Sequence, residues 1–366
     1  MRRAYVQGRL FDGKSLQEGR ALLTEAGKVT AIVMESEVPS SYELYPLDGD
    51  LLAPAFIDLQ IYGGDGRMFS QDTEIDSLTS TYSYSKKGGA GYFMITLATN
   101  TIEKFLEALD VAKAYVQNGG RGLLGVHLEG PYLNPIKRGA HVEALIKKPT
   151  LEEVNRLLEQ GRGIFKMITL APECCDPELI RLLQDQGIIV SAGHSNATYQ
   201  EATAAFDRGI PAATHLFNAM SPFQHRAPGM AGAILDHHNV RCSLVCDGIH
   251  VDYAAVRIAK AVMKERLFYI TDAVAETAQG VYQHLLQGDR YCLPDGTLSG
   301  SALTMAQSVR NGIAHAGIPL EESLRMATSY PASFIQDRKI GVLEPGAEAG
   351  LVVLDASLQV KSVIES

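Results

Sequence analysis

The sequence predicts an α/β protein: a (β/α)8 TIM-like barrel with a small β-sandwich domain built from both termini. Eight short apolar runs in the middle of the chain alternate with amphipathic helical patterns, which is the count for a closed parallel barrel. Stretches of alternating polar and apolar residues occur at both ends. A chain of 366 residues exceeds an average single domain and fits one barrel with a smaller unit.

The two ends of the chain have the pattern of short β-strands. Between residues 6 and 52, segments of alternating polarity are separated by Asp-Gly and Ala-Gly-Lys turns. The tail has the same character, with Leu351–Leu354 as its buried strand. Because both ends could close one sandwich, we expect a small domain from residues 1–52 plus 336–366 and a barrel from residues 53–335.

The candidate barrel strands are short apolar runs without polar alternation, as expected of strands that are buried on both faces. Amphipathic patterns lie between them; one of these, Pro177–Gly187, places its leucines on one helical face and ends on glycine. A second helix is expected over Tyr253–Arg266. The eight candidate strands are Phe56–Gln60, Tyr92–Leu97, Leu124–Glu129, Met167–Ala171, Ile188–Ala192, Ala212–Leu216, Ser243–Cys246 and Phe268–Thr271.

Polar side chains that can bind a metal ion recur where these strands end. Glu129 ends the third strand, His194 and His215 belong to the ends of the fifth and sixth, and Asp272 ends the eighth. The carboxyl ends of parallel strands meet at one rim of a barrel, so these side chains should converge. Two histidines and a carboxylate suit a zinc-type ion with an open position for water or substrate. Asp272 is then the candidate to take a proton from water and pass it to a leaving group.

Other polar residues in these segments have simpler explanations. His127 shares the strand face of the candidate ligand but lies deeper in the strand, so we expect a packed interior histidine. His237 and His238 are expected in a solvated loop. Asp58 is explained equally well by a structural and by a functional role.

Charge and composition exclude several classes of function. A net charge of -9 and a pI near 5.6 provide no electrostatic footprint for nucleic acid. The chain has no apolar run of about 18 residues that could cross a membrane, and its start lacks a signal-peptide core. The five cysteines show no paired spacing. We therefore expect a cytoplasmic protein that binds neither nucleic acid nor membrane.

The segments that carry the candidate residues resemble the N-acetylglucosamine-6-phosphate deacetylases of the amidohydrolase superfamily. The most specific are HLEGP, THLFNAM followed by PG, and DGIHVD, and matching pieces span nearly the whole chain in the family's order. The resemblance implies the barrel and the terminal sandwich. It also implies hydrolysis of the acetamide of N-acetyl-D-glucosamine 6-phosphate to D-glucosamine 6-phosphate and acetate, in amino-sugar catabolism.

The resemblance also implies roles for particular residues. It supports the metal set and the acid/base aspartate proposed above, and it implies that His141 is a second catalytic residue that polarises the acetyl carbonyl or orients the sugar. In similar enzymes the arginine that holds the 6-phosphate reaches across a dimer interface, so a homodimer acting on a phosphosugar is implied. The implied substrate-binding residues are His141, Asn218, Ala219, Arg226 and His250, the last two for the phosphate.

The chain departs from the wider superfamily at two places. Many amidohydrolases carry His-x-His after the first strand to bind a second metal ion, but Gln60 and Tyr62 stand at these positions. Gln60 is a familiar replacement in the family, whereas Tyr62 has no assigned role. We therefore predict one divalent ion per subunit, with Zn²⁺ expected. The second departure, Ala349-Gly350 in place of the usual Ala-Asp, lies in the sandwich and bears on stability.

Two alternative functions remain open at this stage. One is another deacylase or cyclic amidase of the superfamily, such as a dihydroorotase or an N-acyl-amino-acid deacylase. The absence of the His-x-His pair speaks against the two-metal versions. The other is a catalytically inactive barrel that binds phosphosugars. Such proteins usually lose a ligand or the acid/base residue, and this chain retains all four.

Overall fold

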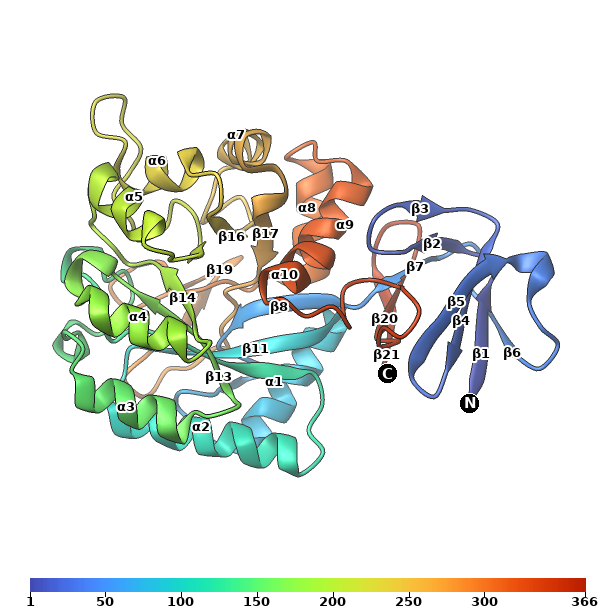
Figure 1. Cartoon of the computed structure of the whole chain (residues 1–366), viewed down its shortest axis with the longest axis horizontal. Coiled ribbons are helices and arrows are strands. Elements are labelled where there is room, and N and C mark those ends of the chain that lie inside the picture. The colour runs from blue at the N-terminus through green and yellow to red at the C-terminus, as the bar shows by residue number, and fades with distance from the viewer.

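Eight parallel strands form the central sheet of the structure, a computed structural model that describes all 366 residues, with helices on the outside of the sheet (Figure 1). They lie in the order β17-β16-β15-β14-β13-β12-β11-β8. All six residues of β8 are buried, as expected of a strand covered on both faces. The predicted (β/α)8 fold is confirmed. The strands are β8 Phe56–Ile61, β11 Ala90–Ala98, β12 Leu123–Glu129, β13 Phe165–Leu170, β14 Ile189–Ala192, β15 Ala212–Ala213, β16 Arg241–Val245 and β17 Leu267–Ile270.

The first and last barrel strands meet through hydrogen bonds just past the end of β17. The Asp272 amide donates to the Gln60 carbonyl at 2.9 Å, and the Tyr62 amide donates to the Ala273 carbonyl at the same distance. Asp58 supports this junction, because its carboxylate accepts from the Thr271 hydroxyl at 2.5 Å. Asp58 therefore has a structural role, and burial raises the pKa of its carboxyl to about 7.

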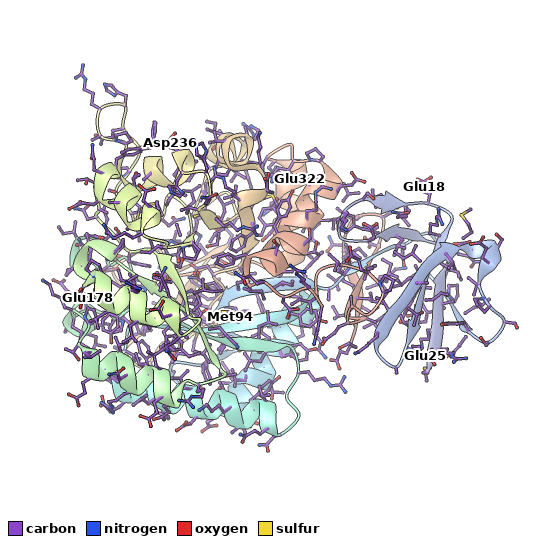
Figure 2. The ribbon with its side chains drawn as sticks, in the orientation of Figure 1. Glu18, Glu25, Met94, Glu178, Asp236 and Glu322 are labelled. Carbon is purple, nitrogen blue, oxygen red and sulfur yellow. The ribbon has the colours of Figure 1, made fainter.

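The helices follow the strands and present one apolar face to them. In α2 the Thr101 side chain caps the first turn by accepting from the Lys104 amide, and Ile102, Phe105 and Leu109 are buried at helical spacing. The outer faces are polar: Glu178 of α4 and Asp236 of α6 are exposed (Figure 2). The helices are α1 Ile75–Lys87, α2 Ile102–Gln117, α3 Leu151–Gln160, α4 Pro177–Asp185, α5 Tyr199–Asp207, α6 Gly229–Asp236, α7 Tyr253–Met263, α8 Met305–Ala314, α9 Leu320–Ala327 and α10 Ser329–Phe334.

The two ends of the chain together build a smaller β unit beside the barrel (Figure 1). One sheet has the order β5-β4-β1-β6 and the other β21-β20-β7-β2-β3, so the C-terminal strand β20 pairs with the N-terminal β7. Buried side chains from both ends, among them Tyr5, Leu22, Leu343 and Val353, share one core. The strands are β1 Arg2–Val6, β2 Arg9–Phe11, β3 Leu16–Gln17, β4 Arg20–Glu25, β5 Lys28–Met34, β6 Glu43–Pro46, β7 Leu51–Pro54, β20 Leu351–Leu354 and β21 Val360–Ile364.

We propose the division into residues 1–52 plus 336–366 and residues 53–335 as the domain organisation. Strand β7 begins at residue 51 and ends at residue 54, so it crosses the first of these boundaries. A single residue joins it to β8. Limited proteolysis can place the boundaries. None of the helices combines the length and the apolar character that a bilayer-spanning segment needs.

The packing around Gly350 in the small unit explains why the chain has Ala-Gly where the superfamily commonly has Ala-Asp. A Cβ added at Gly350 would lie 2.3 Å from the Tyr92 hydroxyl, closer than real Cβ atoms approach a neighbour. Gly350 also accepts a hydrogen bond from the Ala55 amide at 2.9 Å. Tyr92 thus occupies the space that the aspartate of the common Ala-Asp pair would need.

Two short hairpins complete the structure, and neither was predicted. One consists of β9 Gly63–Gly64 and β10 Arg67–Met68, directly after the first barrel strand. The other consists of β18 Leu285–Gln287 and β19 Arg290–Cys292, in the segment between β17 and α8. Both segments contribute side chains to the pocket described next.

Candidate active site

A pocket opens at the carboxyl ends of the barrel strands, with about 780 Å³ of empty space that is partly open to solvent. Eight of the nine predicted site residues line it, and Arg226 does not. The eight are Glu129, His141, His194, His215, Asn218, Ala219, His250 and Asp272.

The strands position the central side chains in a regular way. Glu129 is the last residue of β12, whereas His194, His215 and Asp272 each lie two residues beyond the end of their strands. These three residues have positive φ angles of 46°, 35° and 56°, a left-handed conformation that is rare outside glycine. The chain therefore turns sharply at the rim, at the points where the candidate functional residues stand.

Three of these side chains bring their ligand atoms together. The Nε2 atoms of His194 and His215 are 3.1 Å apart, and they lie 3.3 and 3.1 Å from Glu129 Oε1. Ligand atoms at zinc-binding distances in a tetrahedral site are separated by roughly 3.3 Å, so this spacing fits a single ion. The structure thus contains a Glu/His/His group that could bind a metal ion.

The outer contact of His194 supports this interpretation. His194 Nδ1 lies 2.9 Å from the Lys137 carbonyl, which can only accept, so Nδ1 carries the proton and the lone pair is on Nε2. Burial, together with the facing His141, lowers the pKa of His194 to about 4 and keeps the ring neutral. His215 Nδ1 is buried without a protein partner.

Glu129 is fully enclosed by these partners. Burial alone would raise the pKa of its carboxyl, but the facing histidines outweigh burial and hold the pKa well below its usual range. The carboxylate is therefore charged, as a metal ligand has to be.

His141 also lies beside the Glu129 carboxylate, but its ring is better suited to donate a hydrogen bond than to bind an ion. Its Nε2 lies 3.3 Å from Glu129 Oε2, and Glu129, His141 and His194 form another group close enough to hold an ion. However, the Thr99 backbone amide donates to His141 Nδ1 at 3.2 Å. In a neutral ring Nε2 then carries the proton and faces the pocket as a donor.

Asp272 lies beside the histidine pair and is anchored at one oxygen. The Gln60 amide donates to Asp272 Oδ1 at 2.8 Å, and Oδ2 makes no hydrogen bond within the chain. Burial raises the pKa of this carboxyl, and the nearby Glu129 carboxylate acts in the same direction. Such an aspartate has one free oxygen with which to exchange a proton.

His250 enters the pocket from the loop after β16. Its Nδ1 donates to Asp247 Oδ2 at 2.6 Å, and Asp247 Oδ1 accepts from two backbone amides of the same loop. Burial works against ionisation of Asp247, but the hydrogen bond from His250 outweighs it and lowers the pKa of the carboxyl. The pair fixes the ring and directs its other nitrogen away from the aspartate.

Arg226 lies on a hairpin that stands out from the barrel next to α6 (Figure 1). Gln224 and Ala227 pair with each other across the turn, and residues 222–227 are all exposed. The Arg226 side chain makes no ion pair or hydrogen bond within the chain. A single subunit therefore does not bring Arg226 to the pocket.

Several lining residues were missed from the sequence. Tyr282 and His284, from the segment that carries β18, cover one side of the pocket. The Tyr282 hydroxyl donates to the Thr99 carbonyl at 2.6 Å, and its ring meets His141 edge-on. His284 is buried and contacts the Ser299 carbonyl at 2.9 Å. No strand-end pattern marks these residues. His127, by contrast, is buried inside the barrel as predicted.

An eight-stranded parallel barrel with a carboxylate, two histidines and an aspartate at one rim is the arrangement of hydrolases that use a divalent ion. The chain belongs to the amidohydrolase family, whose model matches residues 51–365. This family is metal-dependent, and the buried ligand atoms of Glu129, His141 and His194 lie close enough together to hold an ion.

Particular relatives are similar over almost their whole length. N-acetylglucosamine-6-phosphate deacetylase of Haemophilus influenzae is 35% identical over 352 residues, which cover 93% of this chain and 92% of that protein. N-acetylgalactosamine-6-phosphate deacetylase of Escherichia coli O157:H7 is 32% identical, with 94% and 96% covered. The crystal structure of N-acetylglucosamine-6-phosphate deacetylase from Pasteurella multocida superimposes with a TM-score of 0.96 at 35% identity, covering 100% of this chain and 98% of that one.

Proposed function

We propose that this chain hydrolyses the acetamide of N-acetyl-D-glucosamine 6-phosphate, releasing acetate and D-glucosamine 6-phosphate, in amino-sugar catabolism. The observation that carries the proposal is the convergence of Glu129, His194, His215 and Asp272 in one pocket. The similarity to deacetylases of N-acetylated hexosamine phosphates supports this choice of substrate.

We propose that Glu129, His194 and His215 hold one divalent ion per subunit, and that the ion is Zn²⁺. When bound, such an ion polarises a carbonyl and lowers the pKa of water. Metal analysis of the purified protein tests the number, with one equivalent expected because Gln60 and Tyr62 replace the usual second pair. Two equivalents per active site would contradict the proposal.

The chain's own groups account for the proton transfers. Asp272, with its free Oδ2, accepts a proton from the water that attacks the acetyl carbon, and later gives that proton to the departing amine. The His141 Nε2–H donates to the carbonyl oxygen as negative charge develops there, which is the kind of stabilisation that often contributes most in acyl transfer. The C–N bond then breaks to give acetate and the free amino sugar.

We propose that the phosphate is held by His250 of one subunit and Arg226 of its partner, in a homodimer. The absence of an intramolecular partner for Arg226 and its place on an exposed hairpin support this arrangement. A cationic guanidinium and a histidine suit a phosphate dianion. Asn218 and Ala219 line the same pocket as His250 and Asp272, and we propose that they contact the sugar.

Acetate release from N-acetylglucosamine 6-phosphate, measured beside the unphosphorylated sugar and with a chelator control, tests the proposed function. We expect fast, chelator-sensitive release from the phosphorylated sugar alone. Equal rates on both sugars would refute the phosphate roles. No release from either sugar by metal-loaded protein would refute the reaction and favour another acyl substrate. The galacto epimer should be assayed in parallel, because one relative acts on it by name.

A mixing experiment tests the dimer. Subunits with Asp272→Asn are expected to lose at least about a hundredfold in turnover, and subunits with Arg226→Ala about 10- to 100-fold in kcat/KM for the phosphorylated sugar. In a mixed dimer, one site combines an intact Asp272 with an intact arginine from the other subunit, so activity should return after subunit exchange. If the mixture stays as inactive as its parts, Arg226 does not act across an interface. A cytoplasmic location, with no nucleic-acid or membrane partner, completes the proposal.

A further inference from the structure

Tyr62, the residue for which the sequence offered no role, is part of the candidate metal site. It follows β8, is 7% exposed, and directs its hydroxyl at Glu129 Oε2. It stands where many relatives in the superfamily have the second histidine of a His-x-His pair.

The direction of the Tyr62 hydrogen bond is fixed by Glu129, because a carboxylate can only accept and the phenol hydroxyl therefore donates. The Gln60 amide nitrogen lies 3.0 Å from the Tyr62 hydroxyl oxygen, 2.8 Å from Asp272 Oδ1 and 3.2 Å from Glu129 Oε1, and its two hydrogens are shared among these three acceptors. Gln60, Tyr62 and Glu129 thus form a directed chain of hydrogen bonds.

The two oxygens of Glu129 consequently have different surroundings. Oε2 receives the Tyr62 hydroxyl, and His141 Nε2 lies 3.3 Å from it. Oε1 faces the Nε2 atoms of His194 and His215, and it also accepts from the Gln60 amide at 3.2 Å. Because Tyr62 holds Oε2, Oε1 is the oxygen that is directed at the histidine pair, where the proposed ion would bind.

We propose that Tyr62 is a positioning residue, whose hydroxyl fixes Glu129 so that the carboxylate binds the metal ion through one oxygen. The proposal deepens the proposed function, because it rests on the same metal ligands. Hydrogen bonds to a metal ligand from outside the coordination sphere commonly contribute about 10- to 100-fold to metal affinity.

A purely structural role for Tyr62 would be carried by its ring. The ring packs with Met68, Val274 and Ala275 in a small buried cluster. Tyr62→Phe keeps these contacts and removes only the hydroxyl, so it separates the two roles. Tyr269→Phe is the matched control, since Tyr269 is also a buried tyrosine with one side-chain hydrogen bond, to Ser323 Oγ at 3.0 Å.

The test is zinc affinity, measured on metal-free protein by competition with a chromogenic chelator and without substrate. We expect Tyr62→Phe to bind zinc 10- to 100-fold more weakly, and Tyr269→Phe to remain within about threefold of the unaltered protein. Thermal melting of the metal-free proteins shows whether both variants are folded. An affinity of Tyr62→Phe within about threefold of the unaltered protein would overturn the proposal.

A second variant restores a donor in place of the phenol. Tyr62→His can offer an N–H to Glu129 Oε2, and its first equivalent of zinc should bind at least several-fold more tightly than in Tyr62→Phe. Binding as weak as in Tyr62→Phe would show that a donor to Glu129 at this position does not support zinc binding, and would overturn the proposal. Both readouts are independent of acetate release, so a wrong substrate assignment leaves this test intact.

Discussion

Replacing Asp272 by asparagine should separate metal binding from proton transfer. In the structure Gln60 donates to Asp272 Oδ1, so an asparagine at this position would turn its carbonyl oxygen to Gln60. Its NH₂ group would then occupy the place of Oδ2, and an amide NH₂ cannot accept a proton. The shape of the side chain and the Gln60 contact are kept, while the acid/base group is lost.

The size of the expected effect follows from the role assigned to Oδ2. A positioned general acid or base contributes about 10²- to 10⁴-fold to a rate, which corresponds to about 2.7 to 5.4 kcal/mol of activation free energy. We therefore expect kcat for acetate release to fall by at least a hundredfold in Asp272→Asn. Zinc content should stay at the level of the unaltered protein, because none of the three proposed ligands is changed.

Asp252→Asn is the matched control for this experiment. Asp252 is an exposed aspartate that caps α7 by accepting from the Ala254 amide, and asparagine caps a helix about as well. The same chemical change should therefore leave turnover unchanged there. Turnover of Asp272→Asn within a few-fold of the control, at equal zinc content, would remove Asp272 from the acid/base role.

Three further predictions concern the phosphate, the small β unit and pH. Arg226→Ala should lower kcat/KM for the phosphorylated sugar by about 10- to 100-fold, as for loss of a charged hydrogen bond. Gly350→Ala should destabilise by about 1 to 3 kcal/mol in urea unfolding because of the clash with Tyr92, and Tyr92→Phe in the same protein should recover part of this loss. Burial lowers the pKa of His284 to about 4 in the folded chain. As the pH falls below 6.5, this side chain therefore takes up a proton in the unfolded chain before it does so in the folded chain. Between pH 6.5 and 4 stability should fall by up to about 3 kcal/mol from this residue, and melts of His284→Gln should show a correspondingly weaker pH dependence.

The metal-capable residues could be predicted because fold and chemistry constrain the same positions. A parallel barrel gathers the carboxyl ends of its strands at one rim, so Glu129, His194, His215 and Asp272, far apart in sequence, had to be neighbours. The fold could be predicted from the apolar runs, because strands that are buried on both faces need apolar side chains at successive positions. The order of these runs along the chain then predicted which side chains would meet at the rim.

The remaining parts of the site depend on contacts that no local pattern encodes. Tyr282 and His284 reach the pocket on an irregular segment with a short hairpin, whose position is set by packing on the Thr99 loop. Tyr62 acquires its partner only when β8 and β12 come together across β11. Arg226 is exposed in a single chain, and the role proposed for it depends on a second one.

The backbone at the rim shows why the pocket can hold its groups in one arrangement. A left-handed conformation outside glycine costs on the order of 1 to 3 kcal/mol and persists only where surrounding contacts enforce it. At Asp272 the amide donates to the Gln60 carbonyl at 2.9 Å, and the carbonyl accepts from the Ser301 amide at 2.9 Å. At His215 the amide donates to Ser243 Oγ at 2.8 Å. The backbone at Asp272 and His215 is thus held by hydrogen bonds to β8, to β16 and to the segment before α8, and a rigid scaffold, rather than the flexibility of a loop, determines where these two side chains stand.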